Sequence, residues 1–187
     1  MRKLKLQVQI SIDGFVGGLN GELDWMTWGW TDDIKTFVDD LTNTCDTILL
    51  GRKMTGGFVT HWEKAIENPG TEEYPFAKKM VDYPKYVFSK TLKESKWNNT
   101  ILEHSTGIIN ELKEQDGKDI VVYGGADFVS NHVNEGLIDE YYLFINPVAV
   151  GNGLRIFGDK EQRFNLELIE SRSFDCGIVL NKYKPKN

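Results

Sequence analysis

Two adjacent glycines lie between an apolar strand pattern and a helical pattern in the later part of the chain. Residues 120–122 form the strand pattern, Gly124 and Gly125 follow, and apolar residues then recur at helical spacing from Phe128 to Val133. A glycine turn lets a ligand approach the backbone, and the first N–H groups of the next helix favour an anion. The segment would suit a pyrophosphate; the alternative is a tight strand-to-helix turn that binds nothing.

A second candidate group follows another apolar strand. Residues 48–50 lead into Gly51, Arg52 and Lys53, and Thr55 lies where a helix could begin. An arginine can hold a phosphate with two parallel hydrogen bonds, and a lysine adds a point charge beside it. The alternative is a pair of solvated cations at the start of a helix.

Ser89 and Lys90 end a third apolar strand, at residues 85–88. Ligands of open α/β sheets collect at the carboxyl ends of the strands. We therefore expect the three strand ends to lie along one edge that suits phosphate groups.

Two carboxylates are candidate acids. Asp33 begins a predicted helix whose N-cap would be Thr31, and Asp13 follows the first strand just before Gly14. A partly buried carboxyl with a raised pKa could donate a proton or anchor a substrate. The alternatives are an ordinary acidic helix start for Asp33 and an Asx turn for Asp13.

Three tryptophans, Trp25, Trp28 and Trp30, surround Gly29 in a glycine-rich loop. They could form a stacking wall for a flat heterocycle or, alternatively, a hydrophobic plug that orders the loop. The three histidines share no ligand spacing, so no metal site is predicted.

Composition narrows the class of protein. With 187 residues, 40% of them hydrophobic, we expect one domain over residues 1–187. The net charge of −6 argues against broad binding to nucleic acid or anionic membranes. The sequence has no apolar signal core and no stretch long enough to cross a bilayer. Cys45 and Cys176 have no metal-ligand spacing and suit a reducing cytoplasm.

Strand patterns alternate with helical patterns and then follow one another near the end. This order predicts an α/β protein with three α/β/α layers, a mostly parallel central sheet and an antiparallel C-terminal hairpin. Strands are expected near 4–12, 47–50, 85–88, 100–103, 120–122, 139–150 (broken by Pro147), 164–172 and 178–183. Helices are expected near 31–41, 72–81, 106–115 and after 125, and a polar loop around Pro69 and Pro75.

The ordered motifs resemble those of a known superfamily. Leu-Gly-Arg-Lys-Met-Thr (50–55), Val-Phe-Ser-Lys (87–90) and Val-Tyr-Gly-Gly-Ala-Asp (122–127) are similar to motifs of the dihydrofolate reductase superfamily, as are residues 11–16, 136–143 and 146–153. The chain looks closest to the reductase domain of riboflavin-biosynthesis enzymes and its stand-alone relatives. The resemblance covers nearly the whole chain.

The resemblance implies NADPH as the cofactor. Arg52 and Lys53 would hold the adenosine 2′-phosphate region with Ser89 near it, and residues 124–127 would wrap the pyrophosphate, although the Asp127 carboxylate must turn away from it. Residues 16–17 would approach the nicotinamide. The cofactor-binding residues so implied are Val16, Gly17, Gly51, Arg52, Lys53, Thr55, Ser89, Gly124, Gly125, Ala126 and Asp127.

The same resemblance implies a reductase of a small pterin-like or aminopyrimidine-like heterocycle, similar to 5-amino-6-(5-phosphoribosylamino)uracil reductase. Asp33 and Asp13 are then the candidate acids, and Trp25, Phe37 and Phe144 the candidate substrate contacts. Phe144 stands where folate reductases carry a hydroxyl, which counts against dihydrofolate. True dihydrofolate reduction and NADPH binding without turnover stay open, and the late strand and hairpin could build a homodimer.

Overall fold

The computed structural model describes residues 1–27, 29–158 and 163–186. The helices and strands follow in chain order: β1 (Leu4–Ser11), α1 (Asp32–Asn43), β2 (Cys45–Gly51), α2 (Arg52–Ala65), α3 (Tyr74–Asp82), β3 (Lys85–Phe88), β4 (Thr100–Glu103), α4 (Ile108–Glu114), β5 (Asp119–Tyr123), α5 (Ala126–Asn134), β6 (Glu140–Asn146), β7 (Leu166–Ser173) and β8 (Val179–Pro185).

A single sheet forms the middle layer of the molecule. Its 8 strands run in the order β4-β3-β2-β5-β1-β6-β8-β7. The pairings from β4 to β6 are parallel, whereas β8 pairs antiparallel with both β6 and β7. The predicted mostly parallel sheet with an antiparallel C-terminal hairpin is confirmed.

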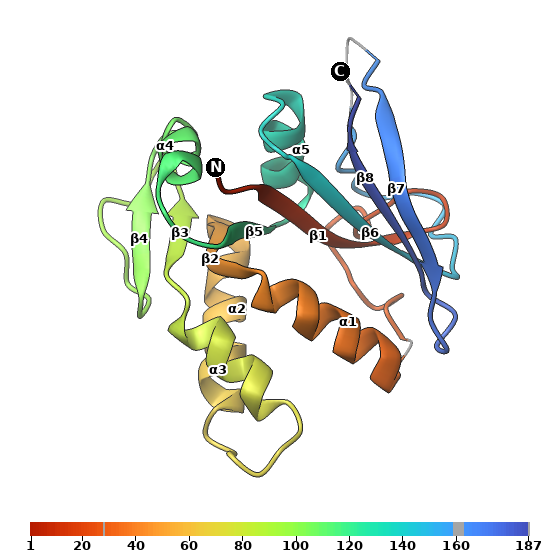
Figure 1. Ribbon diagram of the computed structural model, residues 1–187, viewed down its shortest axis with the longest axis horizontal. Coiled ribbons are helices and arrows are strands. Elements are labelled where there is room, and N and C mark those ends of the chain that lie inside the picture. Colours follow the sequence, from red (N-terminus) through yellow and green to blue (C-terminus); the bar gives the residue numbers. More distant parts are fainter. Residues whose placement is uncertain (28, 159–162, 187) are drawn as a thin grey trace.

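Helices cover both faces of this sheet (Figure 1). On one face, α4 and α5 bury Ile109 and Val129 against β1 and β5. On the other face, α1 packs on β6 and β8 through Ile34 and Val38, and α2 and α3 pack on β2 and β3. The expected three-layer α/β/α arrangement is therefore confirmed, and the core consists of the two apolar interfaces between layers.

Helix α2 occupies a segment for which only a possible helix start near Thr55, followed by a polar loop, was expected. It runs through Arg52–Ala65, and its buried side consists of Thr55 and Val59. Phe58 and Trp62 also pack on a core cluster of buried side chains from β2 and its neighbours, which consists of Cys45, Ile48, Leu50, Met80, Val87 and Val121. These contacts stabilise a helix that its two interior glycines, each unfavourable by about 1 kcal/mol relative to alanine, would disfavour in isolation.

Strand β6 ends at Asn146, at the break that Pro147 was expected to make in the strand predicted over residues 139–150. Pro147 follows it and cannot donate a ladder hydrogen bond, so pairing stops there. The segment beyond Pro147 instead runs along the end of β1, where Ile12 N donates to Val148 O at 2.9 Å. This arrangement brings the loop after β6 beside the loop after β1.

Candidate functional site

The carboxyl ends of the parallel strands meet along one edge of the sheet. Because β1 to β6 all run in the same direction, this edge collects Ser11 from β1, Gly51 from β2 and Gly124 just after β5. Ser89 follows β3 at the same edge. The three strand ends expected to suit phosphate groups are therefore brought together.

Two helices start at this edge without a side-chain cap. Gly51 is the N-cap of α2 and Gly125 is the N-cap of α5, and neither N-terminus has a side-chain cap hydrogen bond. Lys53 Nζ lies 3.5 Å from Asp127 Oδ2, so the two N-termini are neighbours. Uncapped N–H groups and the positive ends of two helix dipoles favour an anion between them.

The charged side chains beside these N-termini are free to move toward a ligand. Arg52 is exposed, and the Lys53 and Asp127 side chains are 84% and 83% exposed. An exposed ion pair contributes little stability, so a phosphate could displace Asp127 from Lys53. The carboxylate that seemed to oppose an anion can thus turn into solvent.

The three glycines of this edge have different structural roles. A Cβ on Gly51 would lie 3.0 Å from Phe128 Cβ, and a Cβ on Gly124 would overlap the Phe128 ring. These two glycines therefore make room for Phe128 of α5. A Cβ on Gly125 would meet no atom within 4 Å, so only here does the turn leave open space for a ligand.

Three other predicted cofactor residues already have partners within the fold. Thr55 is buried and its hydroxyl donates to Gly51 O at 3.0 Å. Ser89 Oγ accepts the N–H groups of Thr91 and Leu92, at 3.2 and 3.1 Å. Ala126 is 5% exposed in the first turn of α5. A ligand would therefore meet mainly the backbone of Ala126 and the hydroxyl proton of Ser89.

Val16 and Gly17 lie in the loop after β1 and pair with the loop after β6. Val16 N donates to Leu154 O at 2.8 Å, and Leu154 N donates to Gly17 O at 2.9 Å. Gly153 packs directly on Gly17, where a Cβ would overlap the Gly17 carbonyl. The two loops thus form a paired wall at the ends of β1 and β6.

The two candidate acids hold segments together, and the pKa of each lies below its ordinary value. Hydrogen bonds from Ser11 and from the N–H groups of Gly151 and Val150 lower the pKa of Asp13 to about 2. The Thr31 hydroxyl and the Asp175 N–H lower the pKa of Asp33 below its ordinary value. The expectation of a raised pKa was wrong, because N–H and O–H donors stabilise the charged form of both carboxylates.

The predicted substrate residues lie at different depths. Phe37 is half-buried on α1, with its ring 6.1 Å from Phe144 and 5.7 Å from Phe174. Phe144 is 1% exposed, so it supports Phe37 from within the core. Trp25 is half-buried, and its indole N–H is buried without an acceptor among the described residues. Trp28 lies outside the described residues.

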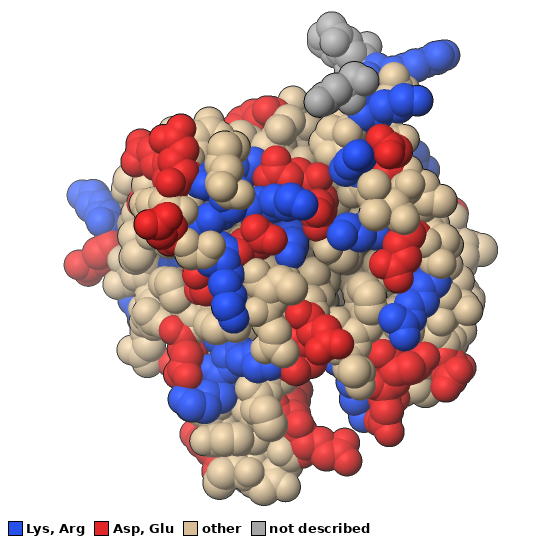
Figure 2. Space-filling view, in the orientation of Figure 1, with Lys and Arg blue, Asp and Glu red and all other residues tan. Residues whose placement is uncertain are grey.

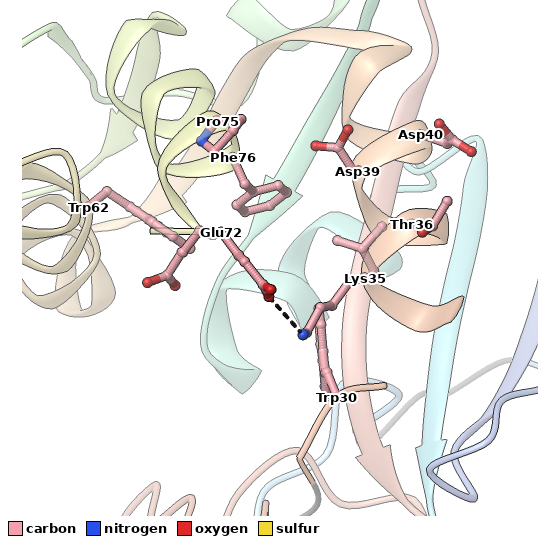
Figure 3. A pocket seen from close by; sticks show the side chains of 11 residues that line it. Trp30, Lys35, Thr36, Asp39, Asp40, Trp62, Glu72, Pro75 and Phe76 are labelled. Atoms are coloured by element: carbon pink, nitrogen blue, oxygen red, sulfur yellow. Dashed lines mark ion pairs between the residues drawn. The ribbon is translucent and has the colours of Figure 1, made fainter. Parts of the chain in front are cut away.

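A cavity of about 620 Å³ opens between α1, α2 and α3. Trp62 and Phe76 face Trp30 across it, and Lys35 reaches from α1 toward Glu72 (Figure 3). The volume falls in the range of small-molecule sites. In the space-filling view the surface is hollowed between the α2–α3 end and α1, with acidic side chains on both sides (Figure 2).

A row of aromatic rings connects the strand edge to this cavity. Tyr123, the last residue of β5, lies 5.7 Å from Phe58, Phe58 lies 6.1 Å from Trp62, and Trp62 lies 5.3 Å from Phe76. Burial raises the pKa of Tyr123, whose hydroxyl donates to Gln7 Oε1 at 3.0 Å. The cavity and the phosphate-compatible edge thus share one continuous wall.

Trp62 and Phe76 were not among the predicted site residues: Trp62 lies in α2, where a polar loop was expected, and Phe76 lies in the predicted helix near 72–81 but was given no role. One signal was available: Phe58 and Trp62 are four residues apart, the spacing of one helical face. Of Trp25 and Trp30, the two tryptophans of the predicted aromatic group that the structure describes, Trp30 lines the cavity.

The described residues form neither a metal-binding cluster nor a membrane-spanning helix. Within residues 1–27, 29–158 and 163–186, no three His, Cys, Asp or Glu side chains lie where they could hold a metal ion. Across these same ranges, no helix combines the length and apolar character needed to cross a membrane.

The sheet order, with helices on both faces of the sheet, is that of a dihydrofolate reductase-like fold. The model of the RibD C-terminal domain family matches residues 2–180, and the chain belongs to that family. The uncharacterized protein YyaP of Bacillus subtilis (strain 168) is 39% identical over 183 residues, which cover 95% of this chain and 92% of YyaP.

Solved structures share the fold at low identity. Dihydrofolate reductase of Enterococcus faecalis, complexed with NADP(H), has a TM-score of 0.62 at 14% identity, over 99% of this chain and 97% of that one. The diaminohydroxyphosphoribosylaminopyrimidine deaminase/5-amino-6-(5-phosphoribosylamino)uracil reductase of Thermotoga maritima has a TM-score of 0.65 at 16% identity, over 99% of this chain and 57% of that one.

Proposed function

We propose that the chain is an NADPH-dependent reductase of a small, planar, pterin-like or aminopyrimidine-like heterocycle. One observation carries the proposal: two uncapped helix N-termini lie side by side at the carboxyl edge of the sheet, next to exposed Arg52 and Lys53. This donor set suits a pyrophosphate and a nearby phosphate monoester. The family and its solved relatives support the reductase class.

Six of the predicted cofactor residues would contact NADPH directly in this proposal. The N–H groups of Gly125 and Ala126 would donate to the pyrophosphate, and Arg52 and Lys53 would hold the 2′-phosphate. The wall formed by Val16 and Gly17 would orient the nicotinamide, which supplies a hydride when NADPH is bound.

On the substrate side, Trp25 and Phe37 are the proposed direct contacts, with Phe144 supporting Phe37. Asp13 and Asp33 act as positioning residues rather than proton donors, because both stay charged near neutral pH. Asp13 fixes the loop that pairs with Val16 and Gly17. In the proposal, the proton that accompanies the hydride therefore comes from water or from the substrate.

Replacing Arg52 with alanine tests the cofactor proposal. Loss of a charge-assisted hydrogen bond should raise the Kd for NADPH about tenfold or more and leave the Kd for NADH nearly unchanged. Both constants can be measured by titration calorimetry. Lys64→Ala, at the exposed far end of the same helix, is the matched control. An unchanged ratio of the two Kd values in Arg52→Ala would refute the clamp.

A protein that binds NADPH without turnover is the second candidate, favoured by the lowered pKa of both candidate acids. Loss of NADPH absorbance with dihydrofolate, and separately with aminouracil ribosides, distinguishes the two. Turnover with an aminopyrimidine establishes the enzyme. Tight NADPH binding with no turnover of any heterocycle would favour the binder.

A further inference from the structure

The cavity between α1, α2 and α3 is distinct in charge from the phosphate-compatible edge. Asp39 and Asp40 line it from α1, and Glu72 and Glu73 line it from the chain just before α3. Among the described residues that line it, Lys35 is the only cation. The walls of this cavity therefore carry more negative than positive charge.

Existing ion pairs leave part of this negative charge uncompensated. Lys79 pairs with Asp39 at 2.5 Å, and Lys35 pairs with Asp32 at 3.2 Å and with Glu72 at 3.6 Å. The ion pair between Lys35 and Glu72 crosses the mouth of the cavity (Figure 3). Because the Glu72 side chain is 93% exposed, this pair is weak and a ligand can replace Lys35.

Aromatic rings supply the apolar part of the cavity. Trp62 and Phe76 contact each other with ring centroids 5.3 Å apart, and Trp30 lies on the opposite wall. The faces of such rings attract cations and stack on flat groups. The aromatic faces and the carboxylates would repel a phosphate, and among the described residues that line the cavity one partly neutralised lysine is the only cation that could hold it.

We propose that this cavity binds a planar organic cation and disfavours ligands that carry a phosphate. This proposal depends on the proposed function in one respect: it assumes that the cavity receives the part of the reductase's substrate that does not react. The aromatic row from Tyr123 to Phe76 provides the shared wall. The favoured substrate is then a heterocycle with a basic or quaternary ring substituent, not a ribosyl phosphate.

Three flat bicyclic probes of similar size test the charge preference without NADPH. These are 1-methylquinolinium as the cation, 1-methyl-2-quinolone as the neutral form and 2-naphthoate as the anion, each titrated by calorimetry. We expect the cation to bind about tenfold or more tightly than the anion, with the neutral probe between them. Equal or tighter binding of 2-naphthoate, or no binding of any probe, would overturn the proposal.

Charge-neutralising variants locate the preference in the cavity. In the double variant Asp40→Asn/Glu72→Gln, the anion Kd divided by the cation Kd should fall about fivefold, and the Kd of the neutral probe should stay unchanged. Both side chains are exposed, so the variant should fold. Glu67→Gln, an exposed carboxylate outside the cavity lining, is the matched control. An unchanged ratio in the double variant would place the preference elsewhere and refute the assignment.

Trp62→Leu tests the aromatic wall separately. It should weaken the cation and the neutral probe about fivefold or more, because both stack on the ring. Far-ultraviolet circular dichroism shows whether this variant is folded. If it is not, the double variant Asp40→Asn/Glu72→Gln decides whether the cavity binds the cation. Unchanged affinity for both probes in folded Trp62→Leu would overturn the stacking role.

A parallel NADPH titration separates the two proposals. If the cation preference holds and NADPH does not bind, the proposed reductase fails while the cavity assignment stands. If NADPH binds and the anion is preferred, the cavity assignment fails while the reductase stands. With both in place, turnover should favour cationic heterocycles over aminouracil riboside phosphates.

Discussion

Asp13 and Asp33 show how a carboxylate can fix a site without taking part in proton transfer. Asp13 accepts the N–H groups of Val150 at 3.1 Å and Gly151 at 2.7 Å, which joins the loop after β6 to the end of β1. Asp33 accepts the Asp175 N–H at 3.0 Å, which joins α1 to the turn between β7 and β8. Each carboxylate therefore links segments that are far apart in sequence.

The low pKa of Asp13 predicts how its contribution to stability depends on pH. A folded-state pKa of about 2, below the ordinary value of 3.8, means that the stabilisation is present above pH 3.8 and is lost as pH falls toward 2. The difference in Tm between the wild type and Asp13→Asn should therefore shrink between about pH 4 and pH 2. Thermal melts monitored by circular dichroism measure it.

Asp24→Asn, an exposed carboxylate in the neighbouring loop, is the control for that experiment. A Tm difference that stays constant down to pH 2 would show that the Asp13 charge does not hold the loop. Under the proposed function, the pH–rate profile of Asp13→Asn should show no break that the wild type lacks between about pH 5 and 8, because Asp13 stays charged across that range.

At the scale of elements, the strand ends were predictable from sequence and helix α2 was not. Residues 50–55, 87–90 and 122–127 are short motifs whose local order fixes where a strand stops. Helix α2 depends in part on packing against a core cluster that includes Met80, Val87 and Val121, from α3, β3 and β5. A local pattern interrupted by Gly56 and Gly57 does not contain these contacts. The cavity was not foreseen for the same reason, since Trp62 belongs to that helix.

Gly124 is crowded by Phe128 and Gly125 faces open space, so replacing each with alanine should affect stability differently. Gly124→Ala should reduce the free energy of unfolding by about 1–3 kcal/mol, because its Cβ overlaps Phe128. Gly125→Ala should change stability by less than about 0.5 kcal/mol, because its Cβ meets open space. Urea denaturation measures both.

Under the proposed function, Gly125→Ala should also raise the Kd for NADPH about tenfold by crowding the approach of the pyrophosphate. Equal loss of stability in both glycine variants would contradict the packing role of Phe128. Unchanged NADPH affinity in Gly125→Ala would contradict a pyrophosphate at this turn.

The whole molecule is built around one sheet, and every helix packs on it. We therefore expect cooperative unfolding in one step, with coincident urea transitions for tryptophan fluorescence and far-ultraviolet circular dichroism. Under the proposed function, NADPH at 100 times its Kd should add about 2.7 kcal/mol to the free energy of unfolding. Two separate transitions would refute the single-domain expectation for residues 1–187.

Helix α2 carries Arg52 at one end and Trp62 ten residues further on, about 15 Å along its axis. Because a helix that is packed on a sheet does not stretch, α2 fixes the distance between the cations at its start and the aromatic wall near its end. The two sites are then tied to a fixed separation, whichever ligands fill them. Ligands would be selected by how far they reach as well as by their charge, and changing the number of turns in α2 would change the length that fits.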